Sequence, residues 1–291
     1  LGGRLTVNQC WYVPAGRDGD HRDPAAQAPI YVTIRAKVVP GSPRLDLNVV
    51  VYNQARDHRL RILFPSGARN AHEYAVEQAF DVVRRPIARP DCTGWKEPQP
   101  ATGPQRSWID VCDGLQGLCV INAGLPECEL FDDADRTAAV TLLRCTGNGV
   151  GLSEDQEEGQ MRSVYRFTLS LLPHTRSWHE DRIWQEAHSV NSALGAVQTD
   201  LHDGPMEPAG SFVEVGSDDL VLTALKIAED DSGIVVRGVN LGEAPIEPEV
   251  AVHAPCLSNP SRVRLDEEPL EGTPSVRPRE IVTLKFHATQ E

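Results

Sequence analysis

The chain has 291 residues, enough for one large domain or two modest ones, and we expect two. Its 42 acidic and 28 basic side chains give a formal net charge of -14, which repels nucleic-acid phosphates and anionic membrane surfaces alike. No apolar run approaches the roughly 18 residues of a spanning helix, so the sequence predicts a protein that binds neither nucleic acid nor membrane.

The chain begins at Leu1, without an initiator Met or a signal sequence, and we expect a mature form or an excised piece. Its seven cysteines are an odd number at irregular separations and include no CxxC pair, which indicates reduced, mostly buried thiols. Both features favour a cytoplasmic protein.

Alternation of apolar and polar residues dominates the first two thirds of the chain. Residues 30–39 show the pattern of a strand with one solvated face, and strands at 45–53 and 59–64 follow after short turns. We expect these three to lie side by side in a meander. Further strands are expected at 74–86, 108–111, 117–121, 138–145 and 165–173. Because short polar connections join them, the sheets should be antiparallel.

One segment, at 177–195, has helical spacing instead. Its apolar residues recur at Ile183, Ala187, Val190 and Leu194, which predicts a short amphipathic helix packed on a sheet, with the acids Glu180 and Asp181 in its first turn. A linker rich in Gly, Pro and acids follows at 198–216. Beyond it, strands at 220–228, 233–241, 249–254, 261–265 and 280–288 predict a compact sandwich.

Sequence motifs for chemistry are scarce. The nine histidines form no H-x-H, H-x-x-H or H-E-x-x-H pattern, and no serine-hydrolase elbow or phosphate loop is present. Acidic residues, including Asp110, are numerous, so a solvated carboxylate is the expected role of each. A surface or hydrogen-bonding role is expected for every histidine, and His174, which ends a strand, is the strongest functional candidate among them.

The stretch Arg106–Leu130 reads as a strand, a glycine turn, a fully apolar strand and a loop that holds Asn122, Gly124 and Glu127. Three cysteines lie within it. From the residues alone, this loop is a catalytic centre, a metal clip or the rim of a scaffold whose chemistry lies elsewhere.

The order of several segments carries a family resemblance. They are "YAVEQAFDVVRRP", "RSWIDVCDGLQGLCVINAGLPECEL", "AVTLLRC" and "YRFTLSLLPH", with Trp178 shortly after the last. Together they resemble the C-terminal half of glycoside hydrolase family 38, the α-mannosidases, and within it the bacterial branch that includes mannosylglycerate hydrolases. The runs from "LVLTALKIAEDDSGIVVRGVNLG" to "EIVTLKFH" resemble the terminal β-domain of that family.

The resemblance implies an all-β chain with one short helix. A large antiparallel supersandwich, similar to that of galactose mutarotase, is expected at 1–212 and a smaller β-sandwich at 213–291. In the family, an N-terminal catalytic domain holds a zinc ion through histidines and aspartates and cleaves the sugar with retention. Those motifs have no counterpart here, so the resemblance implies no metal, cofactor or catalytic residue in this chain, with the catalytic domain as its partner and a mannoside as the sugar.

Loops of the β-half close over the sugar pocket in this family. The resemblance therefore makes Asn122, Gly124, Glu127 and His174 the candidate residues near the substrate. Many relatives have Asn-Asp or Asn-Arg where this chain has Asn122-Ala123, which puts a charged sugar contact at Ala123 in doubt. For Asn122 itself, closing a turn is the favoured role.

Three functions stay open at this point. The chain is the scaffold and partial pocket wall of an α-mannosidase, a stand-alone carbohydrate-binding module, or a sugar enzyme of the mutarotase type. A scaffold that docks a catalytic half should expose an apolar face. The sequence also leaves a homo-oligomer open.

Overall fold

The computed structural model describes residues 2–17, 21–22, 24–147, 156–192, 194–201, 203–204, 207–254, 257, 259–272 and 275–288. The chain divides into two compact units, Leu1–Gln78 with Val83–Leu194, and Ala79–Val82 with Gly195–Glu291. The expected boundary between residues 212 and 213 stays a prediction.

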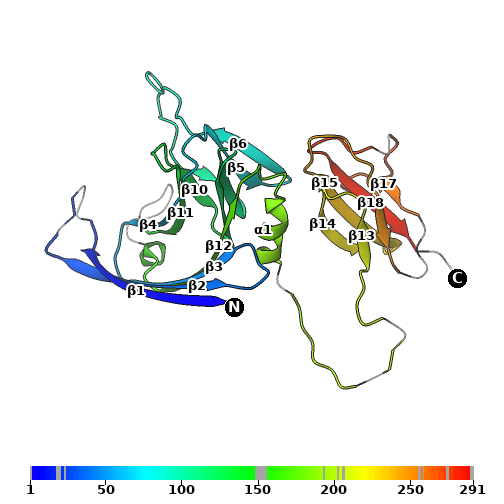
Figure 1. Cartoon of the computed structure of the whole chain (residues 1–291), viewed down its shortest axis with the longest axis horizontal. Coiled ribbons are helices and arrows are strands. Elements are labelled where there is room, and N and C mark those ends of the chain that lie inside the picture. The colour runs from blue at the N-terminus through cyan, green and yellow to red at the C-terminus, as the bar shows by residue number, and fades with distance from the viewer. Residues whose placement is uncertain are drawn as a thin grey trace. The chain divides into compact units, whose positions relative to one another are not determined.

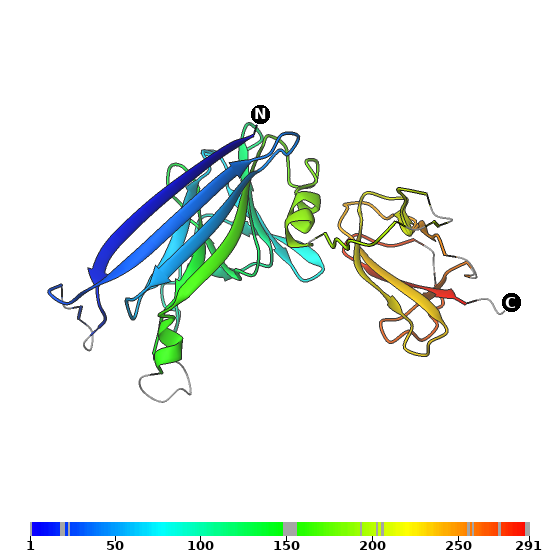
Figure 2. The ribbon, with the colours of Figure 1, turned by 90° about the horizontal axis from the view of Figure 1, so that it is seen from below.

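Unit 1 is built from two antiparallel sheets (Figure 1). The larger sheet has eight strands, which in spatial order are β1 (Gly3–Pro14), β2 (Gln27–Val38), β3 (Leu45–Asn53), β12 (Val164–His174), β9 (Gly117–Asn122), β8 (Trp108–Cys112), β5 (Glu73–Gln78) and β6 (Asp81–Pro86). The smaller sheet has four, in the order β4 (Arg59–Pro65), β11 (Thr137–Arg144), β10 (Glu127–Leu130) and β7 (Gly103–Pro104). Figure 2 shows the long strands of the larger sheet side by side.

The predicted meander is only partly right. Strands β2 and β3 pair as expected, but β4 leaves the larger sheet and pairs with β11. The other edge of β3 is taken by β12, more than 100 residues later in the chain. Asn53, the last residue of β3, stabilises the chain where it leaves the larger sheet. Its buried side-chain amide donates hydrogen bonds to the backbone oxygens of Ala55 and Met161 at 3.0 and 3.1 Å.

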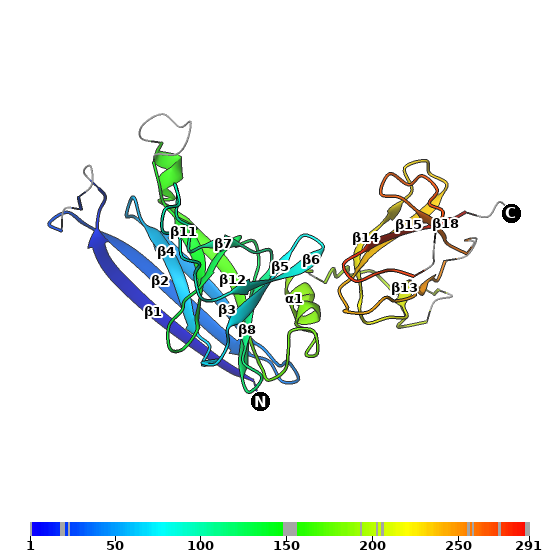
Figure 3. The same cartoon turned by 90° about the horizontal axis from the view of Figure 1, so that it is seen from above.

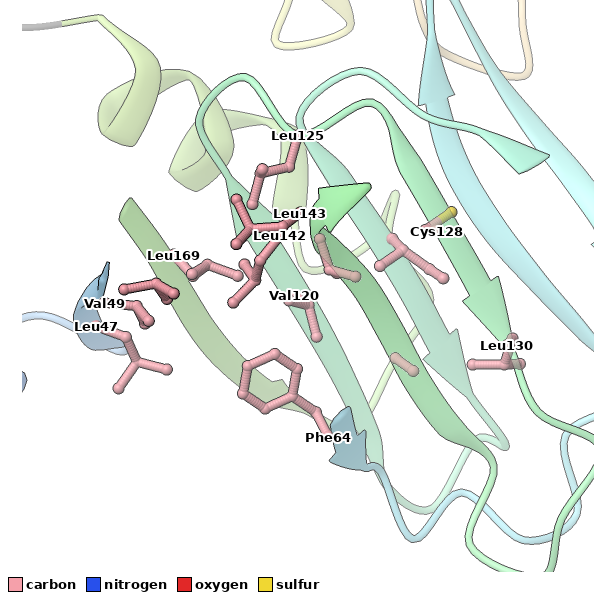
Figure 4. Close-up of a cluster of buried hydrophobic side chains, with 14 of the residues drawn as sticks. Leu47, Val49, Phe64, Val120, Leu125, Cys128, Leu130, Leu142, Leu143 and Leu169 are labelled. Carbon is pink, nitrogen blue, oxygen red and sulfur yellow. The ribbon is translucent and has the colours of Figure 1, made fainter. Parts of the chain in front are cut away.

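The main core lies between the two sheets (Figure 4). Leu47, Val49 and Leu169 come from the larger sheet and meet Phe64 and Val140 from the smaller one. Each buried Val, Leu or Phe side chain contributes about 1.5–3 kcal/mol through removal from water. Burial of this one face explains the period-two pattern of the sequence.

Strand β11 contains a bulge between Thr141 and Leu143. Ala138, Val140 and Leu142 enter the core with normal alternation, but Leu143 directly follows Leu142 into the same core. The extra residue reverses the alternation, because one more residue in a strand exchanges its two faces.

The short helix α1 (Ile183–Asn191) packs against β9 on the face of the larger sheet that is turned away from the main core (Figure 1). Ile183 and Ala187 are fully buried there, as predicted. The helix is shorter than expected, so Glu180 and Asp181 precede it and Leu194, 99% exposed, lies beyond its end. Glu180 bonds Ser177 and Asp181 bonds Arg176, which stabilises the loop before the helix.

Unit 2 is a small β-sandwich. Its four-stranded sheet runs in the order β14 (Leu220–Ile227), β15 (Gly233–Asn240), β18 (Ile281–His287) and β17 (Ser261–Val263), and β13 (Val213–Val215) pairs with β16 (Val250–Val252). The predicted hairpin of β14 and β15 is confirmed. Its core is formed by Leu220, Val236, Val276, Val282, Leu284 and Phe286.

The expected fold class is confirmed. The described residues form antiparallel sheets, one short α-helix and a single turn of 3-10 helix at Glu157–Gln160.

Candidate functional site

The loop after β9 is closed by Asn122. Its side chain is fully buried, and its Oδ1 accepts a hydrogen bond from the backbone N–H of Leu125 at 2.9 Å. Gly124, at the exposed tip, has a φ of 75°, a left-handed conformation that favours glycine. Asn122 therefore has the turn-closing role that the sequence favoured.

Glu127 opens β10 on the outer face of the smaller sheet. It accepts a hydrogen bond from the Thr141 hydroxyl at 2.6 Å, and the guanidinium groups of Arg59 and Arg144 lie 3.5 and 3.7 Å from its carboxylate. Two residues on, Glu129 is nearly buried between two further arginines at 2.5 Å each, Arg61 and Arg89. The predicted sugar contact Glu127 is thus part of a network of two carboxylates and four arginines.

His174 lies at the other end of β9, because it pairs with Gly117. Its imidazole is 4% exposed and its Nε2 lies 2.6 Å from the Oδ1 of Asp110, whose side chain is buried to the same degree. Its Nδ1 donates to the backbone oxygen of Arg176 at 2.8 Å. Asp181 completes the surroundings at 3.7 Å from Nδ1.

His174 and Asp110 form a buried hydrogen-bonded pair. Burial lowers the pKa of His174, but the hydrogen bond and charge of Asp110 outweigh it, so the pKa of His174 is raised. For the Asp110 carboxyl, burial has the opposite effect and raises the pKa, and the hydrogen bond from His174 offsets this only in part. Both shifts favour a protonated pair over one that has lost its proton.

Gly117 makes room for this pair. A Cβ atom at Gly117 would lie 2.6 Å from Cε1 of His174 and 2.9 Å from Cβ of Cys112. Replacing Gly117 by Ala is expected to displace the imidazole and to lower the free energy of unfolding by about 1–3 kcal/mol, as overpacking does. Urea unfolding measures this loss. Gly3→Ala is the control, since a Cβ atom at Gly3 would have no neighbour within 4 Å; equal effects of the two changes would contradict the steric role of Gly117.

A pocket of about 360 Å³ adjoins the pair. Its polar lining groups are already engaged with one another: Glu73 with Arg84, Arg176 with Asp181, and Glu180 with Ser177. Burial raises the pKa of the Cys112 thiol, which also lines the pocket, so this thiol is not an activated nucleophile.

The four predicted site residues fall into two groups. Asn122 ends β9, with Gly124 and Glu127 just beyond it, and His174 lies beside the other end, about 17 Å away at the usual rise of a strand. Their place near a substrate stays a prediction. The sequence expectation was wrong for Asp110, which is 3% exposed and not solvated. A carboxylate inside the apolar run "WIDV" is the feature that could have identified it.

Among the described residues, no group of three or more His, Cys, Asp and Glu side chains is arranged to hold a metal ion. None of the described helices is long and apolar enough to cross a membrane.

Residues 219–284 match the family model described as "Glycosyl hydrolases family 38 C-terminal beta sandwich domain". The chain is also 32% identical over 285 residues to the "Putative mannosylglycerate hydrolase" of Halalkalibacterium halodurans, which covers 94% of this chain and 30% of that protein.

Two solved structures from Enterococcus faecalis match almost the whole chain. One is an α-mannosidase of strain V583, with 27% identity and a TM-score of 0.85 over 99% of this chain and 34% of that one. The other, a protein in glycosyl hydrolase family 38, has 26% identity and a TM-score of 0.84 over 99% and 35% of the two chains. The chain therefore spans about a third of the length of these relatives.

Proposed function

We propose that this chain, as the non-catalytic β part of a glycosyl hydrolase family 38 protein, forms the scaffold and a partial wall of the sugar pocket of a retaining α-mannosidase. The match to an α-mannosidase at a TM-score of 0.85, over 99% of this chain but only 34% of that one, carries the proposal. The catalytic domain, which we place in the remaining part of the polypeptide, is the partner.

The substrate in this proposal is a mannoside, and the reaction belongs to mannose metabolism. The names of the relatives support it, since they are an α-mannosidase and a mannosylglycerate hydrolase. The zinc ion that the family resemblance implies would be held by the catalytic domain. A cytoplasmic location is supported by the six cysteines among the described residues, all of which are free, because free thiols are typical of a reducing compartment.

The chain's own residues serve this function by fixing the two ends of β9. Asn122 closes the loop at one end, and the hydrogen bond between His174 and Asp110 joins β8 to β12 across the other. A loop held by a buried hydrogen bond is positioned with little entropy left to lose when a sugar binds. Gly124 leaves the tip of this loop without a side chain where a sugar would approach.

Activity assays test the proposal. The complete product of the gene that encodes this chain is expected to hydrolyse 4-nitrophenyl α-mannoside or mannosylglycerate with retention, whereas the 291-residue chain should give the rate of buffer alone. Circular dichroism of the 291-residue chain confirms that it is folded in the assay. Hydrolysis by this chain alone, or no hydrolysis by the complete product, would contradict the proposal.

The same samples separate the two alternatives. Mannose binding by the 291-residue chain alone, measured by calorimetry with a Kd tighter than about 1 mM, would favour a carbohydrate-binding module. A rate of glucose or galactose anomer interconversion above that of buffer, measured by polarimetry, would favour a mutarotase-type enzyme.

A further inference from the structure

Strand β1 is solvent-exposed over most of its length. Every residue from Gly3 to Tyr12 is exposed, although β1 is a twelve-residue strand of the larger sheet. Its only paired neighbour among the described strands is β2, so one edge of its backbone is open. Figures 2 and 3 show β1 as the outermost strand of this sheet. Natural proteins normally keep edge strands short, place charged side chains on them or cover them, because an exposed edge pairs readily with other chains.

The face of β1 that continues the main core is apolar but uncovered. Leu5, Val7 and Trp11 share this face with the core residues Ile30 and Val32 of β2, yet they are 62%, 38% and 41% exposed. The smaller sheet has four strands against eight, and β1 stays exposed from Gly3 to Tyr12. An apolar face of this kind is the feature expected of a scaffold that docks a catalytic half.

The opposite face of β1 is also unusual for a solvated surface. Tyr12, Tyr31 and Tyr52 are 65%, 43% and 42% exposed, and the rings of Tyr31 and Tyr52 stack at 5.9 Å. Helix α1 covers the β9 region of this same face but leaves β1 and β2 open. We call Leu5, Val7, Trp11, Tyr12, Tyr31 and Tyr52 the edge surface.

Basic side chains adjoin the edge surface in a chain whose net charge is -14. Arg4, Arg35 and Lys37 line a hollow of about 660 Å³ beside it, and none of them forms an ion pair within the described part of the chain. Cations left unpaired in an acidic protein complement a partner that presents carboxylates.

We infer that the edge surface is the docking site for the part of the family 38 polypeptide that lies outside this chain, through an apolar patch flanked by carboxylates. This inference rests on the proposed function. This chain spans about a third of its relatives, so in those proteins the rest of the polypeptide is covalently attached to it. Its effective concentration is therefore in the millimolar range, and a separate second copy reaches that only in concentrated solution.

Cys10 provides the first test, because it is exposed and lies opposite Tyr31 in the strand register. Alkylation by iodoacetamide at each cysteine is followed by mass spectrometry. In the complete gene product, Cys10 is expected to react at about one tenth of its rate in the 291-residue chain, or more slowly still. Cys92, partly exposed and outside the edge surface, is the internal control and should react equally in both. Equal reactivity of Cys10 in the two proteins overturns the inference.

Leu5→Asp provides the second test, with Leu115→Asp as the matched control on an exposed turn. In the complete gene product, Leu5→Asp is expected to lower the Tm by about 4 °C or more and Leu115→Asp by less than about 1 °C. In the 291-residue chain both should shift the Tm by less than about 1 °C, because both side chains are already mostly exposed. Equal shifts of the two variants in the complete product overturn the inference.

Two further outcomes have defined meanings. If Cys10 of the 291-residue chain is itself slow to react and ultracentrifugation shows a dimer that Leu5→Asp abolishes, a second copy is the occupant and the inference fails. If Cys10 is protected in a complete product that lacks mannosidase activity, the docking site stands and the proposed function fails. If the complete product has mannosidase activity but its Cys10 is not protected, the proposed function stands and the docking site fails.

Discussion

Replacing His174 by Gln is expected to lower the free energy of unfolding of unit 1 by about 3–5 kcal/mol at pH 7, the usual effect of removing one partner of a buried ion pair. The loss arises because Asp110, 3% exposed, would lose its imidazole partner, and a glutamine amide carries no positive charge to balance the buried carboxylate. Urea unfolding followed by tryptophan fluorescence measures it. The double variant with Asp110→Asn as well should recover part of the loss, since the two amides carry no charge. A loss under about 1 kcal/mol would contradict a role of the pair in stability.

The same pair gives a pH dependence with a defined sign. The pKa of His174 is raised in the folded state, so its contribution is complete below its unfolded pKa of about 6.5 and is lost as the pH rises through the folded value. The pKa of Asp110 is also raised, which acts in the same direction. Between pH 6 and pH 9, the wild type should therefore lose stability relative to the double variant, which has nothing to titrate at these positions. A wild type that gains stability over this range would show the opposite sign.

Replacing Trp178 by Ala is expected to lower the free energy of unfolding by about 3–5 kcal/mol, as removal of a buried aromatic side chain does. Trp178 is 3% exposed and its ring lies 5.9 Å from that of Trp108, which is fully buried on β8. Together with Ile183 and Ala187 it joins α1 to the outer face of the larger sheet. Loss of the ring should therefore loosen the helix before the strands.

Unfolding in urea measures the total effect, and hydrogen exchange locates it. The amides of α1 are expected to exchange faster in Trp178→Ala, whereas those of β15 in unit 2 should be unchanged. Trp184→Ala is the control from the same helix, because Trp184 is only partly buried and contacts His188 edge-on. A similar loss of stability in both variants would show that Trp178 has no special role.

Much of the fold was predictable because local alternation reflects one buried face. Strands such as β2 and β3 follow directly from that pattern. The sequence prediction missed β1, in which Gln9 interrupts the alternation of Leu5, Val7 and Trp11. Placing β4 in the wrong sheet had another cause. Pairing of β3 with β12 joins residues more than 100 positions apart, and no local pattern specifies such a partner.

The candidate site was less predictable than the fold. The turn formed by Asn122 could be predicted, since asparagine side chains close turns locally. Asp110 and His174 are 64 residues apart and meet only because β8 and β12 both pair with β9, one on each side of it. The arginines around Glu127 likewise come from β4 and β11. Contacts of this kind depend on the order of strands in the sheets, which a single sequence does not give.

The bulge in β11 restricts how the length of this protein can change during evolution. Arg144, which follows the bulge, is exposed and reaches Glu127. Deleting Leu142 would restore regular alternation, with Leu143 still facing the core and Arg144 still facing Glu127, because Thr141 and Leu143 already pair with the adjacent residues Arg61 and Leu60. Single-residue deletions in β11 are therefore expected to be confined to the bulge, because elsewhere in the strand they would move the following side chains to the opposite face of the sheet.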